Sequence, residues 1–100
     1  MSKGGNMSKK DLEARTYRFA IQTIRFLKRI KASPENNIIK NQLTKSATSI
    51  GANYEEAQGA YSKDDFKYKI SICFREAKET HYWLRVIRDT DICSGDEMDA

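Results

Sequence analysis

The side chains of this sequence that could perform acid–base or nucleophilic chemistry are few and stand apart from one another. His81 is the single histidine, and Glu79 stands two residues before it. A histidine paired with a carboxylate can transfer protons at neutral pH. Because no second histidine accompanies it, we interpret His81 as a partly buried side chain held by hydrogen bonds. Cys73 falls on an apolar helical stripe, and we interpret it as a small hydrophobic residue instead of a nucleophile.

The residue types and their spacing do not indicate a metal or cofactor site. The two cysteines, Cys73 and Cys93, are too few and too widely separated for a zinc site or a disulfide scaffold. No carboxylates stand at Glu-x-x-His spacing, and no glycine-rich loop is present to bind phosphates. We therefore predict a protein that is not an enzyme, with no catalytic residue, no metal and no cofactor.

Cations interleaved with aromatic residues are the main indication of a function. The net charge is +4, but residues 89–100 hold five carboxylates and no Lys or Arg, so residues 1–88 carry +9. Such cations can neutralise phosphates, and exposed aromatic rings can stack on unpaired bases. The alternative is a solvated helix face with no ligand. The predicted nucleic-acid-binding residues are Arg18, Arg25, Lys28, Arg29, Lys67, Arg75, Lys78 and Arg85.

Polar residues close to the apolar stripes indicate contacts between helices. We expect Asn53, Glu56, Glu79 and His81 to form an interhelical network or an oligomer contact, since buried polar groups need partners. Simple surface exposure is the alternative. The adjacent Tyr82 and Trp83 cannot both face the core, so one of them is expected to meet a neighbouring subunit. 

The elements that position these residues are helices. Apolar residues recur at steps of three and four over about residues 11–32, 35–60 and 63–88, and no segment shows strand alternation. Ser8 or Asp11 is expected to cap the first helix, and Ser33 and Ser62 the next two. A proline at position 34 suits a first helical turn. The sequence predicts an all-α, antiparallel up-down bundle.

The domain organisation follows from this pattern. Residues 1–10 are small and polar and are expected to be a disordered leader, and residues 11–100 form a single domain. From residue 95 the sequence indicates a partial fourth helix. Gly51 lies inside the second helical segment, where glycine costs about 1 kcal/mol relative to alanine. We interpret this glycine as a site where a neighbouring helix backbone approaches closely.

Two segments resemble a known family. The run QLTKSATSIGANYEEA at residues 42–57 resembles the signature of the 23S rRNA intervening-sequence proteins, and residues 65–72 and 75–84 are similar to the third helix of that family. Together the resemblance covers roughly residues 15–90. The resemblance implies a four-helix bundle that assembles into a ring, typically a homopentamer. The family is also similar to the basic accessory proteins of diversity-generating retroelements, which associate with nucleic acid.

The resemblance carries no catalytic residues. It implies structural or interfacial roles for Ser46, Ser49, Gly51, Asn53, Glu56, Glu76, Glu79, Tyr82 and Trp83. The fourth helix of the family is expected after the turn near Asp91, where this sequence has few residues left. Three helices with an uncovered apolar groove are expected to associate.

We therefore expect a non-enzymatic, oligomeric helical-bundle protein that binds RNA or another nucleic acid through a basic surface. The alternative is a scaffold for a partner protein that never contacts nucleic acid, with an apolar patch around Trp83. The predicted partners are other copies of the chain, in a homo-oligomer such as the pentamer, and RNA or DNA. No stretch approaches the roughly 20 apolar residues of a membrane span, so a cytoplasmic location without membrane contact is expected.

Overall fold

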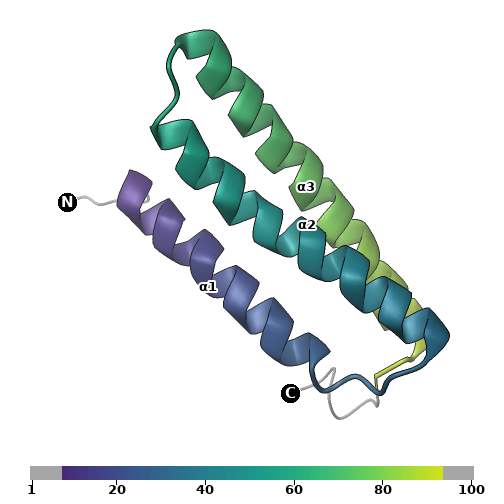
Figure 1. The fold of residues 1–100 in the computed structure, drawn as a ribbon. Helices are drawn as coiled ribbons and strands as arrows, with labels where there is room; N and C mark the ends of the chain where they lie inside the picture. Colours follow the sequence, from purple (N-terminus) through teal and green to yellow (C-terminus); the bar gives the residue numbers. More distant parts are fainter. Residues whose placement is uncertain (1–7, 94–100) are drawn as a thin grey trace.

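Three α-helices make up the part of the protein that the computed structural model describes, residues 8–93 (Figure 1). They are α1 (Lys9–Leu27), α2 (Pro34–Gln58) and α3 (Lys63–Thr90). Consecutive helices run antiparallel, and no strand occurs within residues 8–93. The structure confirms the predicted all-α antiparallel class. The leader at residues 1–7 and the predicted partial fourth helix from residue 95 lie outside the described residues.

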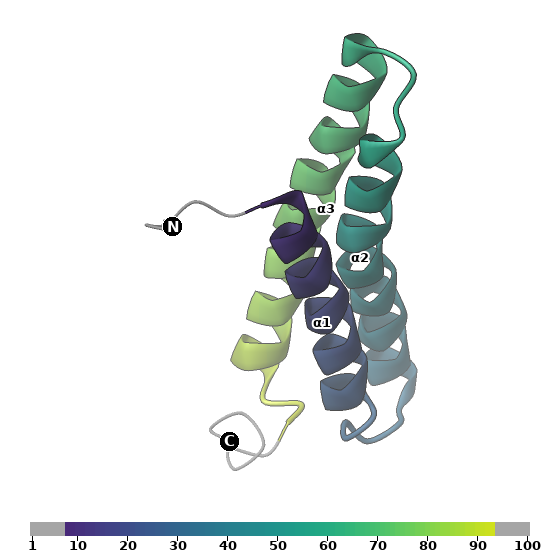
Figure 2. The same ribbon diagram turned by 90° about the vertical axis from the view of Figure 1, so that its left-hand side faces the viewer.

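Helix α2 is the central element of the fold. It packs against α3 and, less extensively, against α1. Figure 1 shows α1 and α3 on either side of α2, whereas in the turned view of Figure 2 both lie to the same side of α2. Helices α1 and α3 share few contacts with each other. A face of the layer between α1 and α3 is therefore left without a covering helix in the described part of the chain.

Each helix begins at a serine whose hydroxyl accepts a hydrogen bond from a backbone N–H in the first turn. Ser8 accepts from Asp11, Ser33 from Asn36 and Ser62 from Asp65. The Asp11 carboxylate accepts in return from the Ser8 backbone N–H, which completes a capping box. The caps predicted at Ser33 and Ser62 are confirmed. At the first helix Ser8 is the cap, so residues 8–10, predicted as disordered leader, belong to the helical segment.

The predicted end of the first helix near residue 32 is wrong, because α1 ends at Leu27. The backbone tightens there into a turn in which Arg29 N–H donates to Phe26 O and Ile30 N–H donates to Leu27 O. This turn brings Ile30 into the core, where its side chain is 3% exposed. Side chains of the following helix donate hydrogen bonds to the backbone carbonyls at the end of this turn. Lys40 Nζ donates to Ile30 O at 2.9 Å, and Asn36 Nδ2 donates to Lys31 O at 2.9 Å.

The predicted ends of the other two helices differ from the structure by two residues. Helix α2 ends at Gln58, before Gly59, instead of at residue 60. Helix α3 continues to Thr90 instead of residue 88 and is followed by Asp91 in the left-handed conformation, with φ of 56°. Aspartate is one of the few non-glycine residues that adopt this conformation at modest cost, and so it can end a helix.

The hydrophobic core lies at the end of the layer where α1 finishes, α2 begins and α3 finishes. Phe19, Phe26, Trp83 and Leu84 pack against it from the sides. Its buried residues are Leu27, Ile30, Leu43, Ala47, Ile87 and Cys93. The opposite end is more open and contains a cavity of about 500 Å³ between Tyr54, Phe66 and the lysines at positions 9, 63 and 67.

Gly51 lies on the side of α2 that packs closely against α1. A Cβ atom at this position would lie 3.1 Å from Thr16 Oγ1 and 3.4 Å from the backbone carbonyl carbon of Thr16. The predicted close approach of a neighbouring helix at Gly51 is confirmed.

Among the described residues, none of the helices combines the length and apolar content that a membrane crossing requires.

Candidate interaction surface

All eight cations predicted to bind nucleic acid have exposed side chains. Within residues 8–93 none of them forms an ion pair with a carboxylate. They do not form a single patch, because they are divided between α1 with its following turn and α3, two helices that have little contact with each other. Lys78 and Arg85 border the same depression on α3, whereas Arg18 and Arg25 lie one heptad apart on α1.

The outer face of α3 alternates aromatic and basic residues. Tyr68, Arg75 and Tyr82 follow one another at steps of seven residues, so they lie along one side of the helix. Tyr68 is 59% exposed and Tyr82 is 50% exposed. The Arg85 guanidinium carbon lies 5.8 Å from the centre of the Tyr82 ring, within the range of a cation–π contact. We call Tyr68, Arg75, Lys78, Tyr82 and Arg85 the α3 outer face.

The prediction that Tyr82 and Trp83 point in different directions is confirmed. Trp83 is partly buried against the core, whereas Tyr82 is half exposed. The two rings meet edge to face, with centroids 5.0 Å apart. Trp83 Nε1 donates to Glu79 Oε2 at 3.1 Å within the same helix. Trp83 packs against the core and leaves only part of its indole exposed to the apolar patch expected around it.

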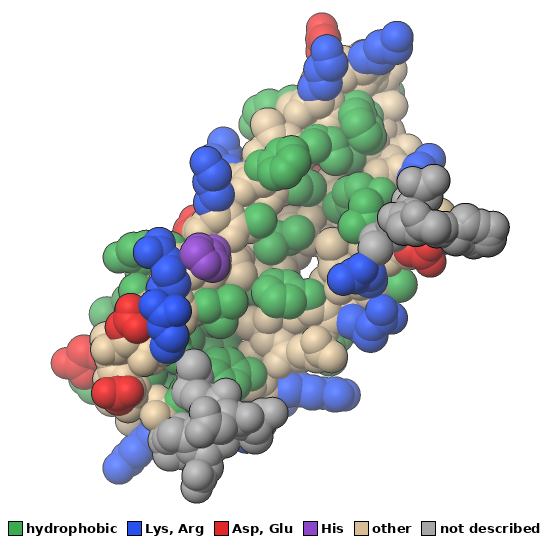
Figure 3. Space-filling view, turned by 180° about the vertical axis from the view of Figure 1, so that it is seen from behind, with side chains coloured by type: hydrophobic (Ala, Val, Ile, Leu, Met, Phe, Trp, Pro, Cys, Tyr) green, Lys and Arg blue, Asp and Glu red, His purple; other side chains and the backbone are tan. Residues whose placement is uncertain are grey.

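An apolar strip occupies the face between α1 and α3 (Figure 3). Lys and Arg side chains lie along its margins, and the histidine marks the side formed by α3. On that side Phe74, which is 69% exposed, and Ala77 share a shallow depression of about 510 Å³ with Lys78, His81 and Arg85. The expectation that His81 is partly buried and hydrogen-bonded is wrong: the ring is exposed and forms no hydrogen bond within residues 8–93.

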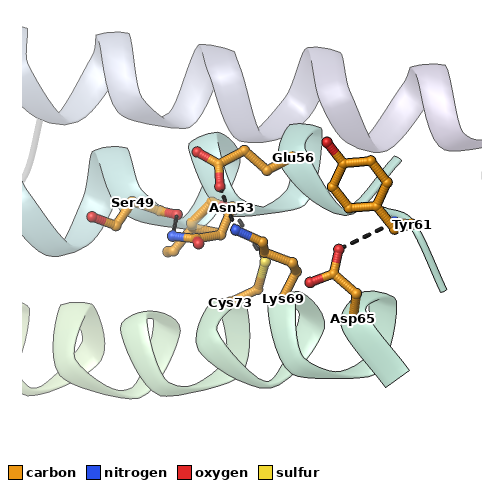
Figure 4. A network of polar contacts seen from close by, with 8 residues as sticks. Ser49, Asn53, Glu56, Tyr61, Asp65, Lys69 and Cys73 are labelled. Carbon is orange, nitrogen blue, oxygen red and sulfur yellow. Dashed lines mark hydrogen bonds and ion pairs between the residues drawn. The ribbon is translucent and has the colours of Figure 1, made fainter. Parts of the chain in front are cut away.

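The polar network predicted at the α2–α3 interface forms only in part. Glu56 of α2 accepts a 2.8 Å hydrogen bond from Lys69 Nζ of α3, and this ion pair crosses the interface (Figure 4). The hydrogen bond and the opposite charge of Glu56 raise the pKa of the Lys69 ammonium. Asn53 Nδ2 instead donates to Ser49 O of its own helix at 2.8 Å, and Glu79 is engaged by Trp83. Glu76 is partly buried.

The buried polar contact between α2 and α3 pairs Ser46 with Thr80, which was not among the residues expected to form the polar network. Thr80 Oγ1 donates to Ser46 Oγ at 2.9 Å, and the two residues are 3% and 1% exposed. Thr80 stands seven residues after Cys73 and seven before Ile87, which places it on the apolar stripe of α3. The helical spacing predicts that Thr80 or its neighbour His81 lies on the packing side of this helix, and the structure places Thr80 there.

The described residues offer little for nucleophilic or metal chemistry. Cys73 is partly buried, and its thiol donates to Ile50 O at 3.4 Å. Burial raises the pKa of the Cys73 thiol, which lowers the population of the reactive thiolate at neutral pH. No group of three or more His, Cys, Asp or Glu side chains in this part of the chain is arranged to hold a metal ion.

Comparison with known proteins places this geometry in a family. The sequence matches the family described as 23S rRNA-intervening sequence protein over residues 9–100. A crystal structure of a protein of unknown function from Bacteroides thetaiotaomicron, assigned to the S23 ribosomal protein family, is similar with a TM-score of 0.81 and 30% sequence identity. The alignment covers 93% of this chain and 83% of the other. No match is found among curated proteins.

Proposed function

This chain belongs to the 23S rRNA-intervening sequence protein family, and from that premise we propose that it is a non-enzymatic protein that binds RNA or another nucleic acid through its exposed cations. The family match covers all three helices, so the cations of α1 and α3 lie inside the matched region. In this proposal, catalysis plays no part, and binding depends on the charge that the helices display.

The observation that carries the proposal is the state of the eight predicted cations. Every one of them is exposed and none forms an ion pair within residues 8–93, in contrast to Lys69 and Arg88, which pair with Glu56 and Asp89. The hydrogen bond from Arg88 lowers the pKa of the Asp89 carboxyl, and the charge of Arg85 does reach Asp89 and helps to lower it. Unpaired surface cations retain their full charge for a polyanion and release condensed counterions when they contact phosphates. The balance of +9 over residues 1–88 adds a long-range attraction for the same partner.

Fluorescence anisotropy with a labelled RNA at several salt concentrations tests the proposal. We expect binding whose affinity falls linearly with salt on a logarithmic scale, with a slope of about 0.7 to 0.9 for each phosphate contacted. A triple substitution of Arg75, Lys78 and Arg85 by Gln is expected to lower that slope by about two to three. The corresponding triple on α1 and its following turn replaces Arg18, Arg25 and Arg29 and reports whether this part of the chain contributes.

A matched control separates specific contacts from net charge. Lys10, Lys31 and Lys45 are exposed, lie outside the predicted set, and remove the same three charges when replaced by Gln. We expect this variant to lower the slope by less than one. Absence of RNA or DNA binding by the unaltered protein at low salt contradicts the proposal, as does an equal effect of the control and the α3 triple.

A second candidate function is protein–protein contact through the apolar strip, either in a homo-oligomer or on a partner protein. The observation that favours it is Phe74, which is 69% exposed beside Ala77 on a face that no described helix covers. We propose that this face contributes to self-association, for which the family resemblance suggests a pentamer. Sedimentation velocity is the test: Phe74→Glu is expected to reduce the assembled fraction, and a monomer in the unaltered protein contradicts self-association.

A further inference from the structure

The outer face of α3 also indicates which kind of nucleic acid fits this protein. On the basis of the proposed function, we infer that this face binds single-stranded nucleic acid, with unpaired bases stacked on Tyr68 and Tyr82 and with Arg75, Lys78 and Arg85 contacting the phosphates. The inference goes beyond charge, because it depends on two exposed tyrosine rings that a duplex cannot use.

The spacing of the two tyrosines suits a short strand. They are separated by 14 residues of continuous helix, which at about 1.5 Å per residue corresponds to about 21 Å. A stacked strand advances about 3.4 Å per phosphate, so this distance spans about six nucleotides. Single-strand-binding folds commonly cover roughly 4 to 16 nucleotides. Arg75 lies midway between the rings, where the backbone of the strand must pass.

The surroundings of Tyr82 place a cation beside the expected base. Arg85 lies 5.8 Å from the ring centre, and half of the tyrosine surface remains exposed. A base that stacks on the exposed part of the ring therefore brings its phosphate close to the Arg85 guanidinium. Lys78 borders the same depression as Arg85, so two cations lie within reach of neighbouring phosphates.

Cations outnumber carboxylates along this part of α3, and one of the nearby carboxylates is paired with a cation. Glu79 accepts a hydrogen bond from Trp83, and Asp89 forms a 2.7 Å ion pair with Arg88. Between residues 67 and 85 the helix carries five Lys and Arg residues against Glu76 and Glu79. The charge balance along the tyrosine face thus favours an anionic backbone.

A duplex cannot make the same contacts, since its bases are stacked on one another and expose only their edges. It offers phosphates to the cations but no free base to Tyr68 or Tyr82. Stacking on an aromatic side chain contributes about 1–3 kcal/mol for each base in single-strand binders. A preference for the unpaired strand should therefore disappear when the two rings are removed, while the salt dependence remains.

The experiment compares a labelled 12-nucleotide RNA alone with the same RNA annealed to its complement. The variant Tyr68→Leu/Tyr82→Leu removes both rings, and Tyr17→Leu/Tyr61→Leu removes two exposed tyrosines from outside α3 as the matched control. We expect the α3 variant to weaken single-strand binding at least tenfold and duplex binding less than twofold, and the control to change neither. Tyr68→Phe/Tyr82→Phe keeps both rings and is expected to retain binding.

Several outcomes overturn the inference. If the unaltered protein binds both RNAs equally, or if losing the tyrosines weakens both equally or neither, single-strand stacking is excluded while the proposed nucleic-acid binding stands. If neither RNA nor DNA binds at low salt, the proposed function itself fails. If Tyr82→Leu instead dissociates an oligomer in sedimentation, the face is a contact between copies of this chain.

A spectroscopic signal reports stacking independently of affinity. Trp83 lies 5.0 Å from Tyr82 and is the single tryptophan of the chain, so its fluorescence responds to changes at that ring. Addition of the single strand is expected to quench Trp83 emission in the unaltered protein and not in Tyr82→Leu. Equal quenching in both proteins contradicts stacking at Tyr82.

Discussion

Thr80 and Ser46 join α3 to α2 through a hydrogen bond in the protein interior. The Thr80 hydroxyl donates to the Ser46 hydroxyl at 2.9 Å, and Ser46 in turn donates to Leu43 O at 3.3 Å. Both side chains are almost completely buried. The bond therefore sets the register of the two helices by pairing two polar groups that have no access to water.

A double-mutant cycle on this pair measures its contribution to stability. Ser46→Ala leaves the buried Thr80 hydroxyl without its acceptor and is expected to lower the free energy of unfolding by about 1–3 kcal/mol. Thr80→Val is expected to cost about 1 kcal/mol, and the double variant less than the sum of the two. Urea unfolding gives all three values. Strict additivity contradicts an energetic coupling between the hydroxyls.

The close contact of Gly51 with Thr16 limits the size of the side chain at position 51. Gly51→Ala gains about 1 kcal/mol in helix propensity but brings its Cβ to 3.1 Å from Thr16 Oγ1, so we expect a net change close to zero. Gly51→Leu cannot be accommodated and is expected to destabilise by about 1–3 kcal/mol. A Thr16→Ala background removes the 3.1 Å contact and leaves the Cβ of residue 16 at 3.3 Å, so Gly51→Ala should be more favourable there than in the unaltered protein. Thermal unfolding of the unaltered protein, the three single variants and the double variant decides this, and a stable Gly51→Leu contradicts the tight α1–α2 contact.

The serine that caps α3 should be more important than a serine within the helix. Ser62→Ala removes the hydroxyl that accepts from Asp65 N–H and is expected to cost about 1 kcal/mol. Ser71 lies exposed in the middle of α3, where alanine is the better helix former, so Ser71→Ala is expected to be neutral or stabilising by up to about 0.5 kcal/mol. Equal losses in chemical unfolding experiments contradict the capping role.

The raised pKa of the Cys73 thiol predicts a dependence of stability on alkaline pH. The folded protein retains the Cys73 proton at a pH where the unfolded chain has released it, so folding is disfavoured as the pH rises above the ordinary thiol pKa and is unaffected well below it. We expect this slope to be smaller in Cys73→Ala. Iodoacetamide should modify Cys73 slowly near pH 8 and faster in urea, as peptide mass spectrometry can measure. Modification of the folded protein at the unfolded rate contradicts burial of the thiol.

The fold class and the starts of the helices were predictable because their causes are local. Apolar residues at three- and four-residue steps require a helix with one buried face, and a serine before such a segment caps it without help from the rest of the chain. The end of α1 was not predictable in this way. The carbonyls of Ile30 and Lys31, in the segment that follows α1, are satisfied by Lys40 and Asn36, which belong to the next helix and reach them only after packing.

The same distinction between local sequence and tertiary packing applies to the candidate binding residues. That the eight cations would be exposed follows from the cost of burying a charge, and the sequence alone determined it. The burial of Thr80 and the exposure of His81, which are neighbours in the chain, depended on which edge of α3 lies against α2. Helical periodicity determines that one face is apolar, but only the angle at which the neighbouring helices pack decides how much of that face they cover, and so which side chains remain for a partner.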